Sequence, residues 1–292
     1  MELKRVVVTG LGAITPLGLD VESTWNNALN GVSGAAPITH FDASKFKTQF
    51  ACEVKGFNPA EHGMDRKEFK RMDLYTQYAV AAANQAINDA NLLDEKIDRN
   101  EVGVIFASGI GGLHTFEQEA GYYALHEDMG PKYSPFFIPM MIADIAAGQI
   151  SIKYGFRGPN FGVVSACATS TNAMIDAFNY IRLGKACAIV TGGSEASVYP
   201  AGVGGFNSMH ALSTRNDSPE TASRPFSASR DGFVIGEGGV CLIFEELEHA
   251  LARGAKIYGE VVGGGMSADA YHITASHPEG LGAKLVMERA IE

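Results

Sequence analysis

The sequence predicts an α/β protein, and three observations support this fold class. Short runs of apolar, mostly β-branched residues end in glycine clusters at residues 5–18, 102–112 and 186–193, which is typical of buried strands followed by tight turns. Longer stretches with helical spacing of apolar residues lie between these runs. Glycine is also frequent, with 34 of 292 residues, as expected for a protein with many tight turns.

Composition and charge exclude several classes of protein. The net charge of −10 argues against non-specific nucleic-acid binding. No run is long and apolar enough to span a bilayer, and the N-terminus lacks signal-peptide organisation. The four cysteines are far apart and form no CxxC pair, which argues against a zinc site or a disulfide framework and favours a reducing cytoplasm.

The first predicted strand and glycine turn, at residues 5–18, also suggest a dinucleotide-binding motif. Three features argue against that alternative. The glycines do not fit GxGxxG, Pro16 stands where the phosphate-binding helix would run, and no tyrosine has a lysine four positions later, as short-chain dehydrogenases require. A helix over residues 21–31, capped by Asp20, is predicted to follow.

The remaining elements follow from the same patterns. Pro135 and Pro139 are predicted to break helix within an apolar loop at residues 133–141. A charged cluster at residues 65–73 is predicted to open a long helix. The predicted helices are 74–90, 115–129, 142–154 and 245–253, and the predicted strands are 239–244 and a new one within 256–265.

One strand–helix junction stands out as a candidate site. Residues 161–166 are predicted as a buried strand and residues 168–183 as a helix, with Cys167 between them. The N-terminus of a helix favours thiolate over thiol, and its N–H groups can hold an oxyanion. A lone cysteine in an apolar stretch is more often a packing residue, so the spacing alone leaves both interpretations open.

The segment Ser165-Ala-Cys-Ala-Thr-Ser170 resembles the nucleophile motif of the β-ketoacyl-acyl carrier protein synthases, the condensing enzymes of fatty acid synthesis. The resemblance, best to the synthase II branch, extends from Lys4 to about Glu288. It includes an intact Arg-Asp-Gly-Phe-Val-x-Gly-Glu-Gly at residues 230–238, although Ser227 replaces the aspartate of the family's Pro-Phe-Asp. It implies a thiolase-like layered αβαβα fold. Residues 1–254 would form the N-terminal half, with nucleophile and dimer elements, and residues 255–292 would begin a truncated C-terminal half.

The resemblance also implies roles for individual residues. Cys167 would be the acyl-accepting nucleophile, and acidic acyl carrier protein would dock on an exposed basic cluster. The alternatives are a solvated helix face for the cluster and ordinary packing for pocket residues. Two departures, His210 for a carrier-contacting arginine and Ala275 for a serine, put single contacts in doubt. The implied docking residues are Lys67, Lys70 and Arg71, and the implied substrate-binding residues are Ile110, Phe137 (from a dimer-interface loop), Phe206 and Thr274.

The implied activity is condensation. An acyl group moves to Cys167 and then joins malonyl-acyl carrier protein with loss of CO₂. The substrates carry phosphopantetheine, and no metal or cofactor is implied; the expected assembly is a homodimer. The family's two catalytic histidines and lysine come later than residue 292, so we expect a fragment whose full activity needs C-terminal residues outside this chain. A polyketide-type ketosynthase and a non-catalytic dimeric fragment remain alternatives; a catalytically inactive chain-length partner fits less well, because its nucleophile position is not usually cysteine.

Overall fold

The structure, a computed structural model, describes residues 3–292. Its centre is a six-stranded mixed sheet with the order β5-β4-β6-β7-β1-β8. The pairs β4–β5 and β4–β6 are parallel, whereas β6–β7, β7–β1 and β1–β8 are antiparallel. The strands are β1 (Val6–Ile14), β4 (Val102–Ala107), β5 (Asn160–Phe161), β6 (Ala188–Glu195), β7 (Gly238–Glu246) and β8 (Gly259–Val261), with β2 (Ala36–Pro37) and β3 (Phe50–Ala51) as a separate pair.

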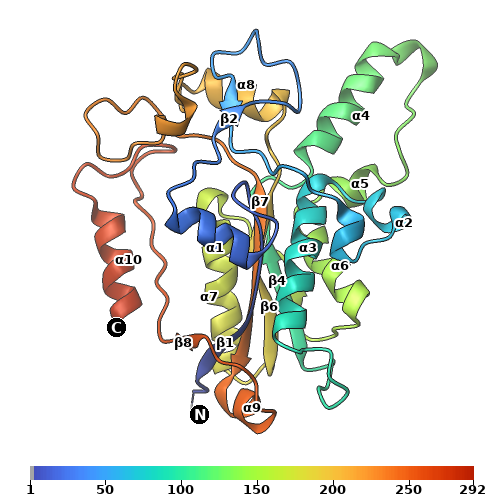
Figure 1. Cartoon of the computed structure of the whole chain (residues 1–292), viewed down its shortest axis with the longest axis vertical. Helices are drawn as coiled ribbons and strands as arrows, with labels where there is room; N and C mark the ends of the chain where they lie inside the picture. The colour runs from blue at the N-terminus through green and yellow to red at the C-terminus, as the bar shows by residue number, and fades with distance from the viewer. Residues whose placement is uncertain (1–2) are drawn as a thin grey trace.

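Helices cover both faces of this sheet (Figure 1). α3 (Leu74–Asp89) and α6 (Ile145–Tyr154) lie on one face, and α7 (Thr169–Arg182) lies on the other. No helix within residues 3–292 combines the length and apolarity needed to cross a membrane. The other helices are α1 (Val21–Leu29), α2 (Arg66–Phe69), α4 (Leu113–Leu125), α5 (Phe137–Met141), α8 (Pro200–Ser208), α9 (Leu247–Ala252) and α10 (Leu281–Ile291).

Side chains alternate between the two faces along each strand, which explains why the sheet has a hydrophobic core on each face. In β4, Val104 and Phe106 pack with α3 and α6, whereas Ile105 packs with α7. Successive strand residues point to opposite faces, so a strand covered on both faces is apolar throughout. The six residues of β4 are all buried, as predicted for a buried strand.

The turn predicted after the first strand comes later than Gly10 and Gly12, because β1 continues through these glycines to Ile14 and the chain turns only at residues 15–18. A Cβ atom on Gly12 would lie 1.9 Å from the carbonyl oxygen of Ala82 in α3, and one on Gly10 would lie 2.2 Å from that of Ala86. The glycines therefore let the alanine-rich helix α3 approach the strand. Their role is close packing rather than a turn.

The glycine turn predicted at residues 186–193 is wrong, since β6 runs through Gly192 and Gly193. A Cβ atom on Gly192 would meet the Val240 carbonyl oxygen at 2.1 Å, so the glycine permits close strand pairing. The buried strand predicted at 161–166 is shorter than expected. Only Asn160 and Phe161 pair with β4, and Val164 is 63% exposed, because the chain leaves the sheet edge there.

The segment 133–141, predicted as a loop, contains a helix. Pro139 lies in the first turn of α5, where a missing N–H removes no helical hydrogen bond. Phe206 lies on α8, which starts at Pro200. The predicted helix 74–90 is confirmed as α3, but the charged cluster before it forms the separate short helix α2.

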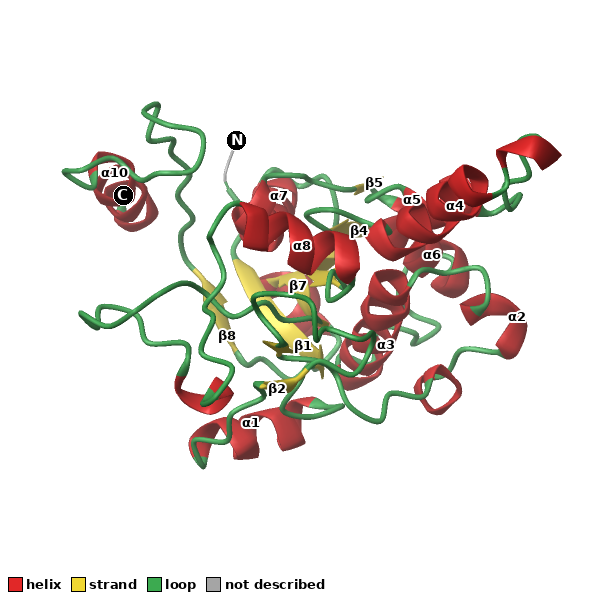
Figure 2. Cartoon of the chain, turned by 90° about the horizontal axis from the view of Figure 1, so that it is seen from above, coloured by secondary structure: helices red, strands yellow, loops and turns green. Residues whose placement is uncertain are grey.

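The last part of the chain begins by extending the same sheet. β8 pairs with β1, and α10 then stands to one side of the sheet (Figure 2). A Cβ atom on Gly264 would lie 3.0 Å from Ile175 of α7, so this segment passes the outer face of α7. The division into halves at residue 254 stays a prediction.

Candidate active site

Cys167 lies in a 3₁₀ turn, Ala166–Ala168, directly before α7. Ala166 has φ of 51°, in the left-handed region that residues with a Cβ atom rarely adopt. Within residues 3–292, no side chain caps α7, although its first N–H, that of Thr169, donates to the carbonyl oxygen of Ala166. A strained turn that exposes a thiol at a helix N-terminus is suited to a nucleophile.

Hydrogen bonds hold this turn in place. The backbone N–H of Ser165 donates to Thr169 Oγ1 at 2.8 Å, and the side-chain amide of Asn172 donates to Ser165 Oγ at 2.7 Å. Thr169 is buried, and α7 is anchored by apolar residues such as Ala173 and Phe178 against the sheet. The rigid helix thus fixes the position of the exposed thiol.

Cys167 opens into a cavity of about 700 Å³ at one end of the sheet. The lining comes from the last residues of β4 and β6, the start of β7 and the beginning of α7. Ile110 and Phe206 both line this cavity with Cys167, so the structure brings together three of the predicted site residues. Phe206 is held by an edge-to-face contact with Phe233, with 5.3 Å between ring centroids.

Two carboxylates that sequence reasoning missed also line the cavity, Glu195 and Glu237. Burial raises the pKa of Glu195, although N–H donors from Gly109 and Ile110 and the hydroxyls of two serines oppose that effect. Glu195 ends a strand beside glycines, and Glu237 lies within the family motif at residues 230–238. An acidic residue at the glycine-rich end of an apolar strand was the signal that could have identified them.

Glu237 belongs to a buried polar network beside the cavity. Its Oε1 atom lies 2.9 Å from His40 Nε2, and it accepts hydrogen bonds from the Tyr78 hydroxyl at 3.1 Å and the Val54 N–H at 2.9 Å. The hydrogen bond to Glu237 raises the pKa of His40, which outweighs the opposite effect of its partial burial. Burial raises the pKa of Tyr78. This network ties the 38–54 segment to the cavity wall.

Phe137 and Thr274 do not line the cavity of Cys167 in this chain. Phe137 lies on α5, where its ring stacks on Phe116 and Tyr133. Thr274 is exposed, and its N–H donates to His272 Nδ1 at 3.2 Å. The substrate contacts of these two residues stay predictions.

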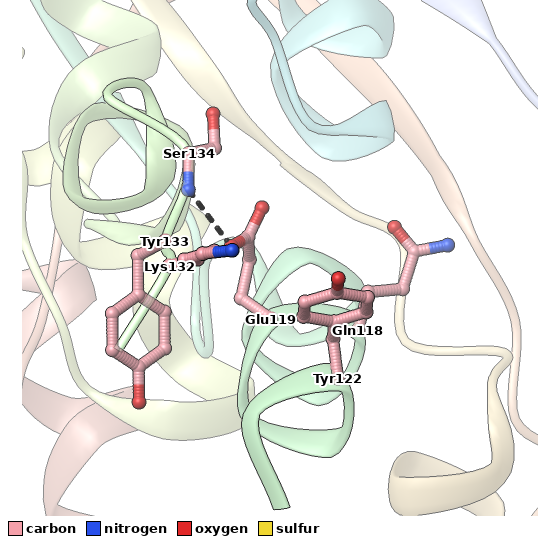
Figure 3. A pocket seen from close by; sticks show the side chains of 6 residues that line it. All are labelled: Gln118, Glu119, Tyr122, Lys132, Tyr133 and Ser134. Atoms are coloured by element: carbon pink, nitrogen blue, oxygen red, sulfur yellow. Dashed lines mark hydrogen bonds between the residues drawn. The ribbon is translucent and has the colours of Figure 1, made fainter. Parts of the chain in front are cut away.

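A second, more open pocket of about 460 Å³ lies on the arm formed by α4 and the following loop (Figure 3). The Ser134 N–H donates to the Glu119 carboxylate at 3.0 Å and ties the loop to α4. None of the predicted site residues lines it. The lining residues are Gln118, Glu119, Tyr122, Lys132, Tyr133 and Ser134.

The predicted docking cluster is exposed and lies at α2. Lys67 is within α2, Lys70 ends it, and Arg71 follows. The Arg71 guanidinium lies over the Phe136 ring, 4.8 Å from its centroid, which connects the cluster to the segment before α5.

Comparison with known proteins places this geometry in a family. Residues 3–250 match the β-ketoacyl synthase, N-terminal domain, family. The chain belongs to the β-ketoacyl synthase family. A 3-oxoacyl-[acyl-carrier-protein] synthase 2 from Synechocystis is 50% identical over all of this chain and 70% of the relative, and one from Staphylococcus aureus is 49% identical over 99% of this chain and 69% of the relative.

Solved structures agree with this assignment to the β-ketoacyl synthases. A β-ketoacyl synthase from Burkholderia phymatum superposes with a TM-score of 0.87 at 33% identity, over 99% of this chain and 71% of that one. A second match is a chain from the solved complex of a type II PKS acyl-carrier protein with its ketosynthase. It superposes with a TM-score of 0.87 at 32% identity, over 99% of this chain and 69% of that one. The predicted thiolase-like α/β fold is confirmed.

Proposed function

We propose that this β-ketoacyl synthase chain acts as a 3-oxoacyl-acyl carrier protein synthase in fatty acid elongation, with Cys167 as its nucleophile. The observation that carries the proposal is the position of Cys167, exposed before α7 and on the wall of a largely apolar cavity. An acyl chain needs an apolar cavity, and its thioester carbonyl needs a nucleophile and an oxyanion site.

In the first step, the Cys167 thiolate attacks the thioester carbonyl of acyl-acyl carrier protein. The N–H groups at the start of α7 stabilise the oxyanion, and its collapse expels the carrier's phosphopantetheine thiolate. The acyl group is then held as a thioester on Cys167, with its chain in the cavity beside Ile110 and Phe206. The carrier supplies the phosphopantetheine, so we expect this step to need no metal or cofactor.

In the second step, malonyl-acyl carrier protein loses CO₂, and the resulting carbanion attacks the thioester on Cys167. The thiolate leaves, and the product is a 3-oxoacyl chain two carbons longer. Within residues 3–292, no histidine or lysine lines the cavity. We therefore expect decarboxylation to need the histidine and lysine side chains that the family resemblance places outside this chain.

Two surfaces would serve partners in this reaction. The cluster Lys67, Lys70 and Arg71 would receive an acidic acyl carrier protein, and Thr274 would contact its pantetheine arm. The arm of α4 and α5 would form the homodimer interface, with Phe137 closing the acyl tunnel of the second copy. Support for the dimer comes from the apolar exposure of this arm, where Ile138 is 54% and Leu125 is 82% exposed.

We also infer that the protein works in a reducing, cytoplasmic compartment. All four cysteines are free in the structure, including the exposed Cys167. Free thiols persist where disulfides are kept reduced.

A polyketide-type ketosynthase is the second candidate. It is favoured by the similarity to the ketosynthase of the type II PKS complex, which is 32% identical to this chain. The two functions share acyl transfer to Cys167 and differ in the acyl groups accepted. Competition between a straight-chain acyl carrier protein and a polyketide-loaded one would separate them.

Intact mass measured before and after incubation with acyl-acyl carrier protein tests the proposal. We expect an acyl adduct that peptide mapping assigns to Cys167. It should be absent in Cys167→Ala and retained in Cys187→Ala, which changes a partly buried thiol outside the cavity. No adduct on the folded wild-type chain would overturn the proposed transfer step and favour a non-catalytic dimeric fragment.

A further inference from the structure

The turn that carries Ile110 into the cavity is bound by one carboxylate, that of Glu195. Its Oε2 atom accepts the backbone N–H groups of Gly109 at 3.0 Å and Ile110 at 3.1 Å. Its Oε1 atom accepts the hydroxyls of Ser108 at 3.3 Å and Ser197 at 3.2 Å. All four contacts converge on one side chain at the end of β6.

Ser108 links the same carboxylate to the next backbone N–H of the turn, that of Gly111. Ser108 Oγ, which donates to Glu195, accepts the N–H of Gly111 at 2.9 Å. Three successive N–H groups, of Gly109, Ile110 and Gly111, thus point to one side of the turn. Such a nest of backbone donors binds anions, and here the protein supplies the anion itself.

The turn has little free space between this carboxylate and the nucleophile. A Cβ atom on Gly109 would lie 3.0 Å from Glu195 Oε2 and 3.3 Å from the carbonyl oxygen of Ala166, next to Cys167. On its other side, a Cβ atom on Gly112 would lie 2.3 Å from the Met140 carbonyl oxygen of α5. Glu195 therefore fixes a wall that separates Cys167 from α5.

We propose that Glu195 is a positioning residue for selection of the acyl chain: by binding the 108–111 turn, it holds the cavity wall at Ile110. The inference deepens the proposed function and rests on it for the identity of the chain. Ile110 is 45% exposed, so burial alone does not hold its side chain. Its place in the cavity depends on the backbone that Glu195 binds.

The hydrogen-bond pattern predicts how two substitutions differ. In Glu195→Gln, the amide oxygen can still accept the N–H groups of Gly109 and Ile110, while its NH₂ group donates to the hydroxyls of Ser108 and Ser197. In Glu195→Ala, all these bonds are lost and the turn loosens. Glu195→Gln should therefore keep the turn in position, whereas Glu195→Ala should not. If negative charge were required at this position, Glu195→Gln would fail as well.

Alkyl methanethiosulfonates test the positioning role of Glu195 without a carrier protein. The Cys167 thiolate attacks the sulfenyl sulfur, forms a disulfide with the alkylthio group, and expels methanesulfinate. The rates with methyl and octyl reagents are measured by intact mass and peptide mapping. Each methylene of the octyl chain that is buried in the cavity favours the longer reagent. A loosened wall buries fewer of them, so we expect Glu195→Ala to lower the octyl-to-methyl rate ratio by roughly tenfold. The methyl rate should stay within about twofold of wild type.

Amide hydrogen exchange of the 108–112 peptide provides a second readout. It should accelerate in Glu195→Ala and less in Ser108→Ala, and stay near wild type in Glu195→Gln. Asp89→Ala is the matched control, because this carboxylate also binds a backbone N–H, that of Leu11 at 3.0 Å, and does not line the cavity.

The outcomes separate this inference from the proposed function. An unchanged rate ratio with unchanged exchange in Glu195→Ala would overturn the positioning role. An equal loss in Glu195→Gln would show that the charge, and not the geometry of the turn, is needed, which also contradicts it. Should Glu195→Ala fail to fold, Ser108→Ala must still lower the rate ratio. Failure of carrier-dependent acylation alone would count against the proposed function and leave the result on Glu195 intact.

Discussion

Thr169 Oγ1 accepts the backbone N–H of Ser165 at 2.8 Å, and this bond closes the turn around Cys167. The first residue of α7 thus fixes the chain two residues before the thiol. The positive φ of Ala166 costs free energy, so this bond helps to stabilise the conformation that exposes Cys167.

Thr169→Val should therefore weaken acyl transfer. It keeps the shape of a buried side chain but leaves the Ser165 N–H without its acceptor, so we expect a loss of about 1–3 kcal/mol in unfolding free energy. Misplacement of the thiol should lower the acylation rate of Cys167 roughly tenfold. Rate and urea midpoint should recover in Thr169→Ser, and Thr171→Val, at an exposed site in the same helix, should resemble wild type. An acylation rate unaffected by Thr169→Val would contradict this role.

Two glycine substitutions should have opposite effects on stability. Gly12→Ala places a Cβ atom 1.9 Å from the Ala82 carbonyl oxygen, so α3 and β1 must separate. A loss of several kcal/mol, about 3 or more, is expected from that rearrangement. Gly205→Ala adds a Cβ atom with no heavy atom within 4 Å, inside α8. It should stabilise by up to about 1 kcal/mol, from helix propensity. Urea unfolding of both variants provides the comparison, and equal effects would contradict the packing argument.

The docking proposal predicts a local effect of charge. A single exposed ion pair with the carrier protein contributes little, so all three residues are changed together. Replacing Lys67, Lys70 and Arg71 by glutamate should weaken acyl-carrier-protein binding roughly tenfold or more. Added salt should weaken wild-type binding and have little effect on the triple variant. Lys96→Glu, an exposed control outside the cluster, should bind as wild type does. Binding isotherms at two ionic strengths measure this, and equal losses in both variants would point to total charge alone.

The dimer proposal predicts that the arm of α4 and α5 is sensitive to charge. Ile138→Glu places a carboxylate at a 54% exposed apolar position on this arm, so we expect dissociation to monomers in sedimentation velocity. Leu251→Glu, at a 56% exposed position on α9, should leave the dimer intact. If wild type sediments as a monomer across a wide range of concentration, the homodimer proposal is wrong.

The sequence predicts the α/β class and most helices because apolar periodicity is local information. It does not distinguish a glycine that turns the chain from one that allows close approach, so Gly12 and Gly192 were misinterpreted. Cys167, Ile110 and Phe206 were identified by resemblance and meet in one cavity. Glu195 was missed because its partners, Gly109 and Ile110, are 86 and 85 residues away in the sequence. Only the folded chain brings them together.

The pair formed by His40 and Glu237 predicts a pH dependence of stability. The hydrogen bond to Glu237 raises the pKa of His40 above 6.5, its ordinary value. A raised folded-state pKa means that the native state binds the proton more tightly than the unfolded state. The stabilisation is therefore fully present below about pH 6.5 and is lost as the pH rises through the folded-state pKa.

Urea unfolding of wild type and His40→Gln between about pH 5.5 and about pH 8.5 tests this relationship. The difference in unfolding free energy between the two proteins should be largest at the acidic end and shrink with rising pH. His62, whose pKa is lowered by burial, is present in both proteins, so its opposite pH dependence cancels in the difference. The pKa of His114 is lowered by burial and, to a smaller extent, by the charge of His40, so only the effect of burial on His114 cancels. Glu237→Gln should also remove the dependence, because the proton on His40 then loses its acceptor carboxylate. A difference that grows as the pH rises would mean that His40 is neutral in the native state and that Glu237 does not hold its proton.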